Sequence, residues 1–186
     1  HYYLSVTLPL EFRKRSATLT QMVSDDGNRT SISGSLNDDR SLSYGASVSN
    51  IGYSDTSASG NLQYISPYAT VNAMGMKGDD VHQLGLNVKG ALVGHSEGIS
   101  FSPSNVDTMV LVHAENAKGA TVNNTVGLKV DPWGYAVIPY ARPYRINDIS
   151  LDPKGVSDRV ELLSSSAQLA PYAGAITKVN FKTKSG

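Results

Sequence analysis

The chain has 186 residues, with 16 Lys and Arg against 16 Asp and Glu, and only 17% of its residues are charged. Because it has no surplus of basic residues, the composition argues against a nucleic-acid-binding protein. The absence of cysteine excludes thiol nucleophiles, thiolate zinc sites and disulfides. Ten Tyr and 17 Gly, with many Ser and Thr, favour a β-rich protein whose polar residues are mostly uncharged.

From residue 1 to about residue 103 the sequence alternates apolar residues with small polar ones. In the first run, Leu4, Val6 and Leu8 fall on one face of a predicted strand. Ser5 and Thr7 fall on the other face, because successive side chains of a strand point to opposite sides. Further strands are predicted at 17–23, 30–36, 42–50, 60–66, 68–77 and 81–93.

Acidic pairs lie in three of the connections between these predicted strands: Asp25–Asp26, Asp38–Asp39 and Asp79–Asp80. Asp, Asn and Gly are typical turn residues, because they tolerate positive φ or bond their own backbone. The pairs lack the dense oxygen-ligand spacing of a calcium loop, so turns are favoured over cation sites. We therefore expect successive antiparallel hairpins.

The second face of these strands carries mainly Ser, Thr, Asn, Gln and Gly. A soluble sandwich usually puts Lys and Glu on its outer face. A transmembrane β-barrel instead alternates lipid-facing and water-facing residues along strands of roughly ten residues. Periodicity alone leaves both readings open. For a barrel, the candidate pore-lining residues are Thr18, Thr20, Ser43, Ser47, Gln83 and Asn87, although a shift in strand register would move any of them to the outer face.

The pattern changes after Pro103. Proline and charge become denser, and apolar runs at 108–112, 135–140, 160–163 and 175–181 no longer alternate cleanly. Short bounded runs of this kind are typical of strands in a compact sandwich. The predicted fold is therefore all-β, with a sheet of about seven or eight strands over residues 1–103 and a small β-sandwich domain over 104–186.

Several stretches, in order along the chain, carry a resemblance to a known family. They are Gly90–Ile99, Thr108–His113, Val126–Tyr140, Tyr144–Asn147, Leu151–Asp152 and Gly174–Phe181. Together they resemble the fimbrial outer-membrane usher family of the chaperone–usher pathway. The resemblance implies that residues 1–103 are the C-terminal strands of a larger outer-membrane barrel and that 104–186 are a periplasmic domain. The chain would then be a fragment of a usher.

The usher resemblance implies an outer-membrane pore that receives chaperone-bound pilus subunits, promotes donor-strand exchange and secretes the fibre. Its expected partners are chaperone–pilin complexes, the rest of the usher chain and outer-membrane lipid, with no nucleic acid. We expect no catalytic residue and no cofactor.

Two groups of residues in the second domain are candidates for binding. Arg142, Tyr144, Arg145 and Asn147 lie where strands give way to loops, and the resemblance favours this loop as a docking surface. Arg145 and Asn147 can equally be structural and close a turn through backbone hydrogen bonds. The family motif residues Trp133, Gly134, Tyr135, Pro139 and Tyr140 invite a binding interpretation too, but core packing is favoured for Trp133.

Other functions remain as alternatives. Both halves could form a soluble or surface β-sandwich adhesin, and strand count alone permits a small closed eight-stranded barrel. An enzyme would need a pocket with converging titratable groups. No metal site is predicted, because His95 and Glu97 have no third ligand nearby in the sequence.

Overall fold

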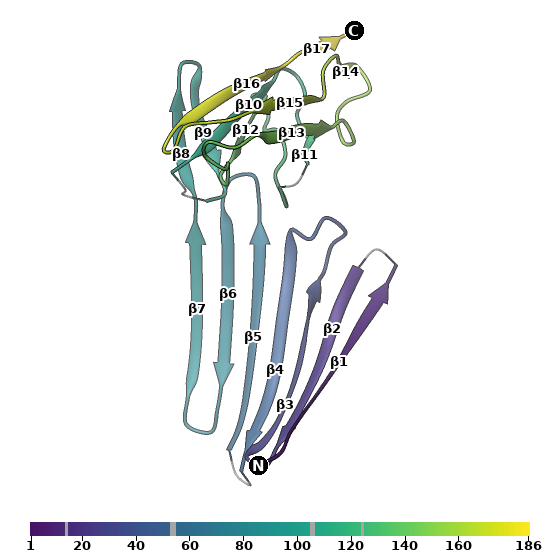
Figure 1. The fold of residues 1–186 in the computed structure, drawn as a ribbon, viewed down its shortest axis with the longest axis vertical. Helices are drawn as coiled ribbons and strands as arrows, with labels where there is room; N and C mark the ends of the chain where they lie inside the picture. The colour runs from purple at the N-terminus through teal and green to yellow at the C-terminus, as the bar shows by residue number, and fades with distance from the viewer. Residues whose placement is uncertain (14, 53–54, 105–106, 124) are drawn as a thin grey trace. The chain divides into compact units, whose positions relative to one another are not determined.

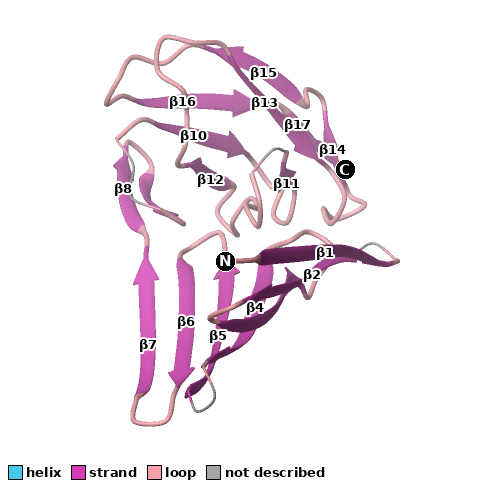
Figure 2. Ribbon diagram, turned by 60° about the horizontal axis from the view of Figure 1, so that its bottom comes forward, coloured by secondary structure: helices cyan, strands magenta, loops and turns pink. Residues whose placement is uncertain are grey.

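The computed structural model describes residues 1–13, 15–52, 55–104, 107–123 and 125–186. Within these ranges it contains 17 strands and no helix. Figure 2 draws strands and loops alone. Accordingly, the described part of the chain has no helix with the length and hydropathy needed to cross a membrane. The chain divides into two compact units, one of residues 1–64 with 71–88, the other of residues 65–70 with 89–186.

The first unit is built from one seven-stranded sheet in which each strand pairs with its neighbours in sequence. This meander can be followed in Figure 1 from purple to teal. Its strands are β1 (Tyr3–Phe12), β2 (Arg15–Ser24), β3 (Gly27–Ser35), β4 (Leu42–Ile51), β5 (Asp55–Ile65), β6 (Thr70–Lys77) and β7 (His82–Lys89). The acidic pair Asp25–Asp26 forms the tight connection between β2 and β3, as the sequence predicts.

The register separates apolar from polar side chains across this sheet. Between β4 and β5, Tyr44 lies opposite Leu62, so these two side chains share a face. Ser47 lies opposite Ser59, and both point to the other face. The alternation predicted from sequence therefore produces one largely apolar face and one hydroxyl-rich face.

Both faces of this sheet are accessible. Leu84 is 95% exposed and Leu86 is 74% exposed. Of the described residues in this unit, only Ala17 and Ser41 are buried. Among the described residues of this unit, the leucines and valines of the apolar face are largely exposed, whereas a soluble sandwich requires a second sheet over them. The alternative of a β-sandwich adhesin is therefore not favoured for this unit.

The second unit has a layered β-fold with its own hydrophobic core. Its strands are β8 (Ala91–His95), β9 (Gly98–Ser102), β10 (Met109–Ala114), β11 (Thr121–Val122), β12 (Tyr135–Ile138), β13 (Asn147–Asp152), β14 (Val160–Leu162), β15 (Ser166–Leu169), β16 (Ile176–Phe181) and β17 (Thr183–Ser185). They form the sheets β12-β10-β16 and β11-β13-β15 and the pairs β8-β9 and β14-β17. β10 and β16 are parallel, and the other strand pairs of this unit are antiparallel.

Strand β10 lies at the centre of this unit, because both of its faces are buried. Val110 and Val112 pack in one cluster with Ile149 and Leu151 of β13. Leu111, on the opposite face, packs in a second cluster with residues of β8 and β12. The run predicted at 108–112 is therefore a fully buried strand, which explains why it does not alternate.

The division between the units lies nearer the N-terminus than the expected boundary between residues 103 and 104. The predicted run 81–93 is interrupted at Gly90, where a Cβ would lie 2.9 Å from the Ser102 carbonyl oxygen and 3.2 Å from that of Tyr68. Three residues after Gly90, Val93 of β8 is only 3% exposed and belongs to the core of the second unit. The β8–β9 hairpin therefore folds with the second unit.

Candidate functional site

The hydroxyl-rich face of the first unit holds four of the six candidate pore-lining residues. Thr18 lies opposite Ser33 and Thr20 opposite Ser31, and the next pairing places Ser31 opposite Ser47. Ser43 shares the Ser47 face of β4, because the two are four residues apart. The other two candidates, Gln83 and Asn87, lie on the face of β7 opposite Leu84 and Leu86.

Hydroxyl groups on this face bond to one another across neighbouring strands. The Oγ atoms of Ser47 and Ser59 are 2.7 Å apart, and those of Ser49 and Ser57 are also 2.7 Å apart. Arg29 adds one cationic group, whose Nη2 donates to Ser47 Oγ at 3.5 Å. The face is therefore polar but weakly charged, and some of its hydroxyl groups form hydrogen bonds with each other.

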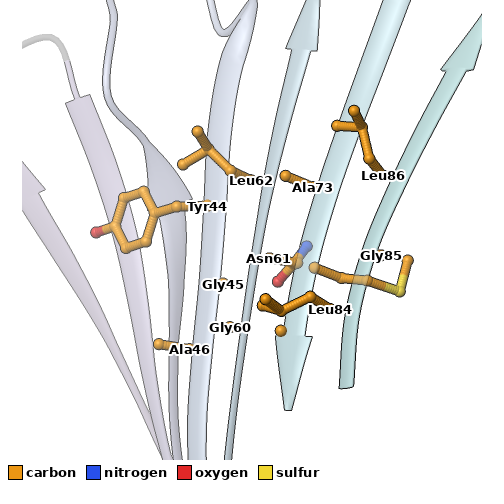
Figure 3. Close-up of a pocket in the computed structure, with 12 residues that line it drawn as sticks. Tyr44, Gly45, Ala46, Gly60, Asn61, Leu62, Ala73, Leu84, Gly85 and Leu86 are labelled. Atoms are coloured by element: carbon orange, nitrogen blue, oxygen red, sulfur yellow. The ribbon is translucent and has the colours of Figure 1, made fainter. Parts of the chain in front are cut away.

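A hollow of about 670 Å³ lies where glycines follow one another on neighbouring strands (Figure 3). Its floor includes Gly45 of β4, Gly60 of β5, Gly75 of β6 and Gly85 of β7. Leu84 lies over Gly75, with Cδ2 3.3 Å from where a Cβ would be. The residues that line the hollow include no charged side chain, so it does not offer the converging titratable groups that an enzyme site would need.

In the second unit, Asp131 organises the turn that carries the family motif. Its Oδ1 accepts backbone N–H bonds from Trp133 and Tyr135, both at 2.9 Å. Gly134 has φ +87, and a Cβ there would lie 3.0 Å from the Ala114 carbonyl oxygen. Burial raises the pKa of the Asp131 carboxyl, and the backbone N–H groups that it accepts oppose this effect.

The core-packing prediction for Trp133 is wrong. Trp133 is 69% exposed, because it projects from this tight turn. The neighbouring Tyr135 takes the core position instead and is 6% exposed. Pro139 is also fully buried, whereas Tyr140 is 62% exposed and donates its hydroxyl to Ser104 Oγ at 3.0 Å.

Titratable side chains surround the Tyr135 ring. The His113 ring stacks on it at 4.6 Å between centroids, and the His95 ring lies 4.5 Å away. Glu97 pairs with Lys178 at 2.8 Å, and this hydrogen bond lowers the pKa of the Glu97 carboxyl. Among the described residues, no group of three His, Cys, Asp or Glu could hold a metal ion. His95 and Glu97 instead fasten the β8–β9 hairpin to its neighbours.

The candidate docking loop, residues 141–147, is closed by the side chain of Asn147. Its Oδ1 accepts the Arg142 backbone N–H, and its Nδ2 donates to the Arg142 and Arg145 carbonyl oxygens, all at 2.9 Å. Of the two roles that the sequence left open for Asn147, these bonds fit the structural one. Tyr144 has φ +56 and is 70% exposed, a backbone conformation that an aromatic residue rarely adopts.

Sequence reasoning missed Tyr172, which lies beside this loop. The Tyr144 and Tyr172 rings meet edge to face with 6.0 Å between centroids, and Tyr172 is 75% exposed. The Tyr144 N–H also donates to the Pro171 carbonyl oxygen at 2.8 Å. The two segments are distant in sequence, so only their contact reveals that they form one surface.

Comparison with known proteins identifies the family. The family model described as "Outer membrane usher protein" matches residues 1–181. The chain belongs to the outer membrane usher family. The first unit's exposed apolar face and the second unit's motif turn are therefore features of a usher.

Curated ushers of three bacteria match nearly the whole chain. It is 35% identical over 186 residues to the usher MrkC of Klebsiella pneumoniae, covering 97% of this chain and 22% of that protein. It is 33% identical over 183 residues to FimD of Escherichia coli K12, with coverage of 95% and 21%. HifC of Haemophilus influenzae is 32% identical over 185 residues, with coverage of 97% and 22%. The chain thus spans about a fifth of the length of these ushers.

A solved structure shares the fold. A chain in the cryo-EM structure of the E. coli P pilus tip assembly intermediate PapC-PapD-PapK-PapG matches with a TM-score of 0.67 and 20% identity. The match covers 95% of this chain and 23% of the other. The all-β fold predicted from sequence is confirmed at this level.

Proposed function

We propose that this chain is the part of a usher that contributes strands to the wall of an outer-membrane pore and carries a periplasmic domain. The complete protein receives chaperone-bound pilus subunits, promotes exchange of the chaperone's strand for that of the next subunit and secretes the fibre. The observation that carries this proposal is the seven-stranded sheet, which leaves an apolar and a hydroxyl-rich face both exposed in a chain of the usher family.

Membrane physics supports the assignment of the two faces. A barrel wall needs lipid-facing apolar residues that alternate with water-facing ones. A sheet in lipid also cannot keep unpaired edges, so β1 and β7 would pair with further strands of the usher in a barrel larger than this sheet. On this proposal Thr18, Thr20, Ser43, Ser47, Gln83 and Asn87 face the pore.

The pore face suits the passage of a folded fibre. Its polar groups are mostly uncharged, and four of its serine hydroxyls bond in two pairs across neighbouring strands, so these four would bind a passing subunit less strongly. The second unit would lie in the periplasm, with Arg142, Tyr144 and Arg145 available to chaperone–pilin complexes. Strand exchange is a form of β-augmentation driven by the better complementation of its product, so this mechanism assigns no catalytic residue.

A chimera tests the function. The segment of MrkC that matches this chain is replaced by it, and the chimera is expressed with the MrkC chaperone and pilins in cells without another usher. We expect fimbriae at the cell surface by electron microscopy. If the chimera reaches the outer membrane at the MrkC level but displays no fimbriae, the proposal fails.

A matched pair of variants tests which face meets lipid. Leu86→Arg puts a charge on the proposed lipid face, which costs about 2–4 kcal/mol near the bilayer midplane. Asn87→Arg puts the same charge on the proposed pore face, where water solvates it. We expect Leu86→Arg to lower the amount of folded chimera in the outer membrane and Asn87→Arg to leave it unchanged. The reverse order would mean that the faces are assigned the wrong way round.

A further inference from the structure

We propose that two loops of the second unit form one composite docking face, which binds an acidic segment of the chaperone–pilin complex. The face consists of Arg142, Tyr144, Arg145 and Ile146 from one loop and Tyr172 from the other; we call it the Tyr144–Tyr172 face. This inference rests on the proposed function for the existence of the partner. It adds the surface that holds the partner, the part that Tyr172 plays in that surface, and the negative charge of the segment that binds there.

The first observation is that the two tyrosine rings pack on each other rather than in the core. Both remain at least 70% exposed while they meet edge to face. Ile146, in the same loop as Tyr144, is 62% exposed. Exposed Tyr and Arg side chains are those that most often dominate binding energy in protein interfaces. The two loops therefore present an aromatic pair and an exposed aliphatic side chain to a partner.

The second observation is that both loops are fixed in place. Asn147 closes the first loop with three hydrogen bonds, and the Tyr144 N–H joins this loop to Pro171 of the second. The second loop is fastened in turn, because the Gly174 N–H donates to Thr108 Oγ1 at 3.0 Å. A surface that is ordered before binding loses less entropy when a partner docks. Asn147 is thus a positioning residue of this face.

The third observation is the charge of the two loops. Residues 141–147 contain two arginines and no acidic residue, and residues 170–174 contain no charged residue. None of the salt bridges among the described residues involves Arg142 or Arg145. The Arg142 guanidinium donates to the Ile146 carbonyl oxygen of its own loop, at 3.4 Å. Asp148, next to the loop, accepts a bond from Gln168 at 2.6 Å. The unpaired arginines therefore favour a partner that carries carboxylates.

Site-specific photocrosslinking in the MrkC chimera tests the proposal. Tyr172 is replaced by the photoreactive residue benzoylphenylalanine, and the chimera is expressed with the MrkC chaperone and pilins. The matched control puts the same residue at Trp133, which is also an exposed aromatic of this unit but lies outside the face. We expect an adduct with chaperone or pilin from position 172 and a much weaker one from position 133.

Variants of the face separate recognition from folding. Arg142→Glu with Arg145→Glu should lower the adduct yield at position 172 by at least about fivefold, whereas Lys at both positions should preserve it. Tyr144→Gly should lower the yield as well, although glycine accepts the positive φ without strain. Tyr144→Phe, which keeps the ring, should not.

The crosslinked adduct is measured whether or not the chimera assembles fimbriae. An adduct from position 172 only with lipid or with the usher itself, or equal adducts from 172 and 133, would overturn the docking face. A yield that is indifferent to charge reversal would overturn the acidic partner. Fimbriae without the adduct would leave the proposed function standing and remove only this inference.

Discussion

Asp131→Ala is expected to lower the stability of the second unit markedly, although it removes only one small side chain. The Asp131 side chain is only 7% exposed, and its Oδ1 accepts the backbone N–H groups of Trp133 and Tyr135. Alanine leaves both donors without this partner. A buried donor left unsatisfied costs about 1–3 kcal/mol, and the Trp133 N–H is only partly buried, so its loss costs less than that of the buried Tyr135 N–H. We expect a loss of about 2–4 kcal/mol in the free energy of unfolding.

Asp131→Asn separates the hydrogen bonds from the charge. Asparagine keeps an Oδ1 acceptor, so the turn stays closed. Burial raises the pKa of Asp131, so the native state binds the proton more tightly than the unfolded state does. The wild type is therefore penalised at neutral pH, and the penalty disappears as the pH falls through the raised pKa toward the ordinary value of about 3.9. The Asp131→Asn variant should be at least as stable as the wild type near pH 7, and this advantage should disappear near pH 4.

Pulse proteolysis of the chain in detergent micelles across a urea series measures these stabilities. Trp133 fluorescence is a poor probe of unfolding here, because its side chain is already exposed in the folded state. If Asp131→Ala unfolds at the same urea concentration as wild type, the role of the carboxylate oxygen in the turn is refuted. If Asn is as harmful as Ala, the charge rather than the acceptor is what matters.

Two further predictions concern the β8–β9 hairpin. Gly90→Ala should destabilise the second unit by about 1–3 kcal/mol in the same assay, because its Cβ would press on two backbone carbonyls; Gly94→Ala, whose Cβ would meet open space, is the control. Glu97→Gln should speed hydrogen exchange in β8 and β9 at neutral pH, because it weakens the bond to Lys178. Since that bond lowers the Glu97 pKa, its contribution is present above the ordinary value and is lost as the pH falls through the lowered one. Wild type and variant should therefore converge in acid, and a difference that persists there would contradict the assignment.

The first unit could be predicted well from sequence, because a two-residue period is local information. Alternation of Leu4, Val6 and Leu8 with hydroxyl residues predicts a strand with two unlike faces, and acidic pairs mark its turns. The period cannot show where a run breaks. Gly90 divides the predicted run 81–93 where the carbonyl oxygens of Ser102 and Tyr68 approach it. A hairpin of 68–77 with 81–93 already brings Tyr68 near Gly90, whereas Ser102 belongs to β9, beyond that run.

The second unit could be predicted less well, because its strands are short and packed on both faces. The sequence predicts the run 108–112, but it does not predict Asn147–Asp152 and Ser166–Leu169, which pair with each other. Trp133 and Tyr135 show the same limit within one motif. Both are large aromatic residues beside a glycine, and the turn held by Asp131 decides which of them is exposed.

The backbone strain at Tyr144 supports the proposal that its ring contacts a partner. Among the described residues, four non-glycine residues have positive φ, and Tyr144 is the only aromatic one. The left-handed conformation costs a residue with a side chain about 1–2 kcal/mol. Burial does not offset this cost, because the ring is 70% exposed. Glycine occupies such positions elsewhere in this unit, at Gly134 and Gly174 for example. A tyrosine in a strained and exposed position, with its ring edge to face against Tyr172, therefore fits the proposed docking face better than a purely structural role.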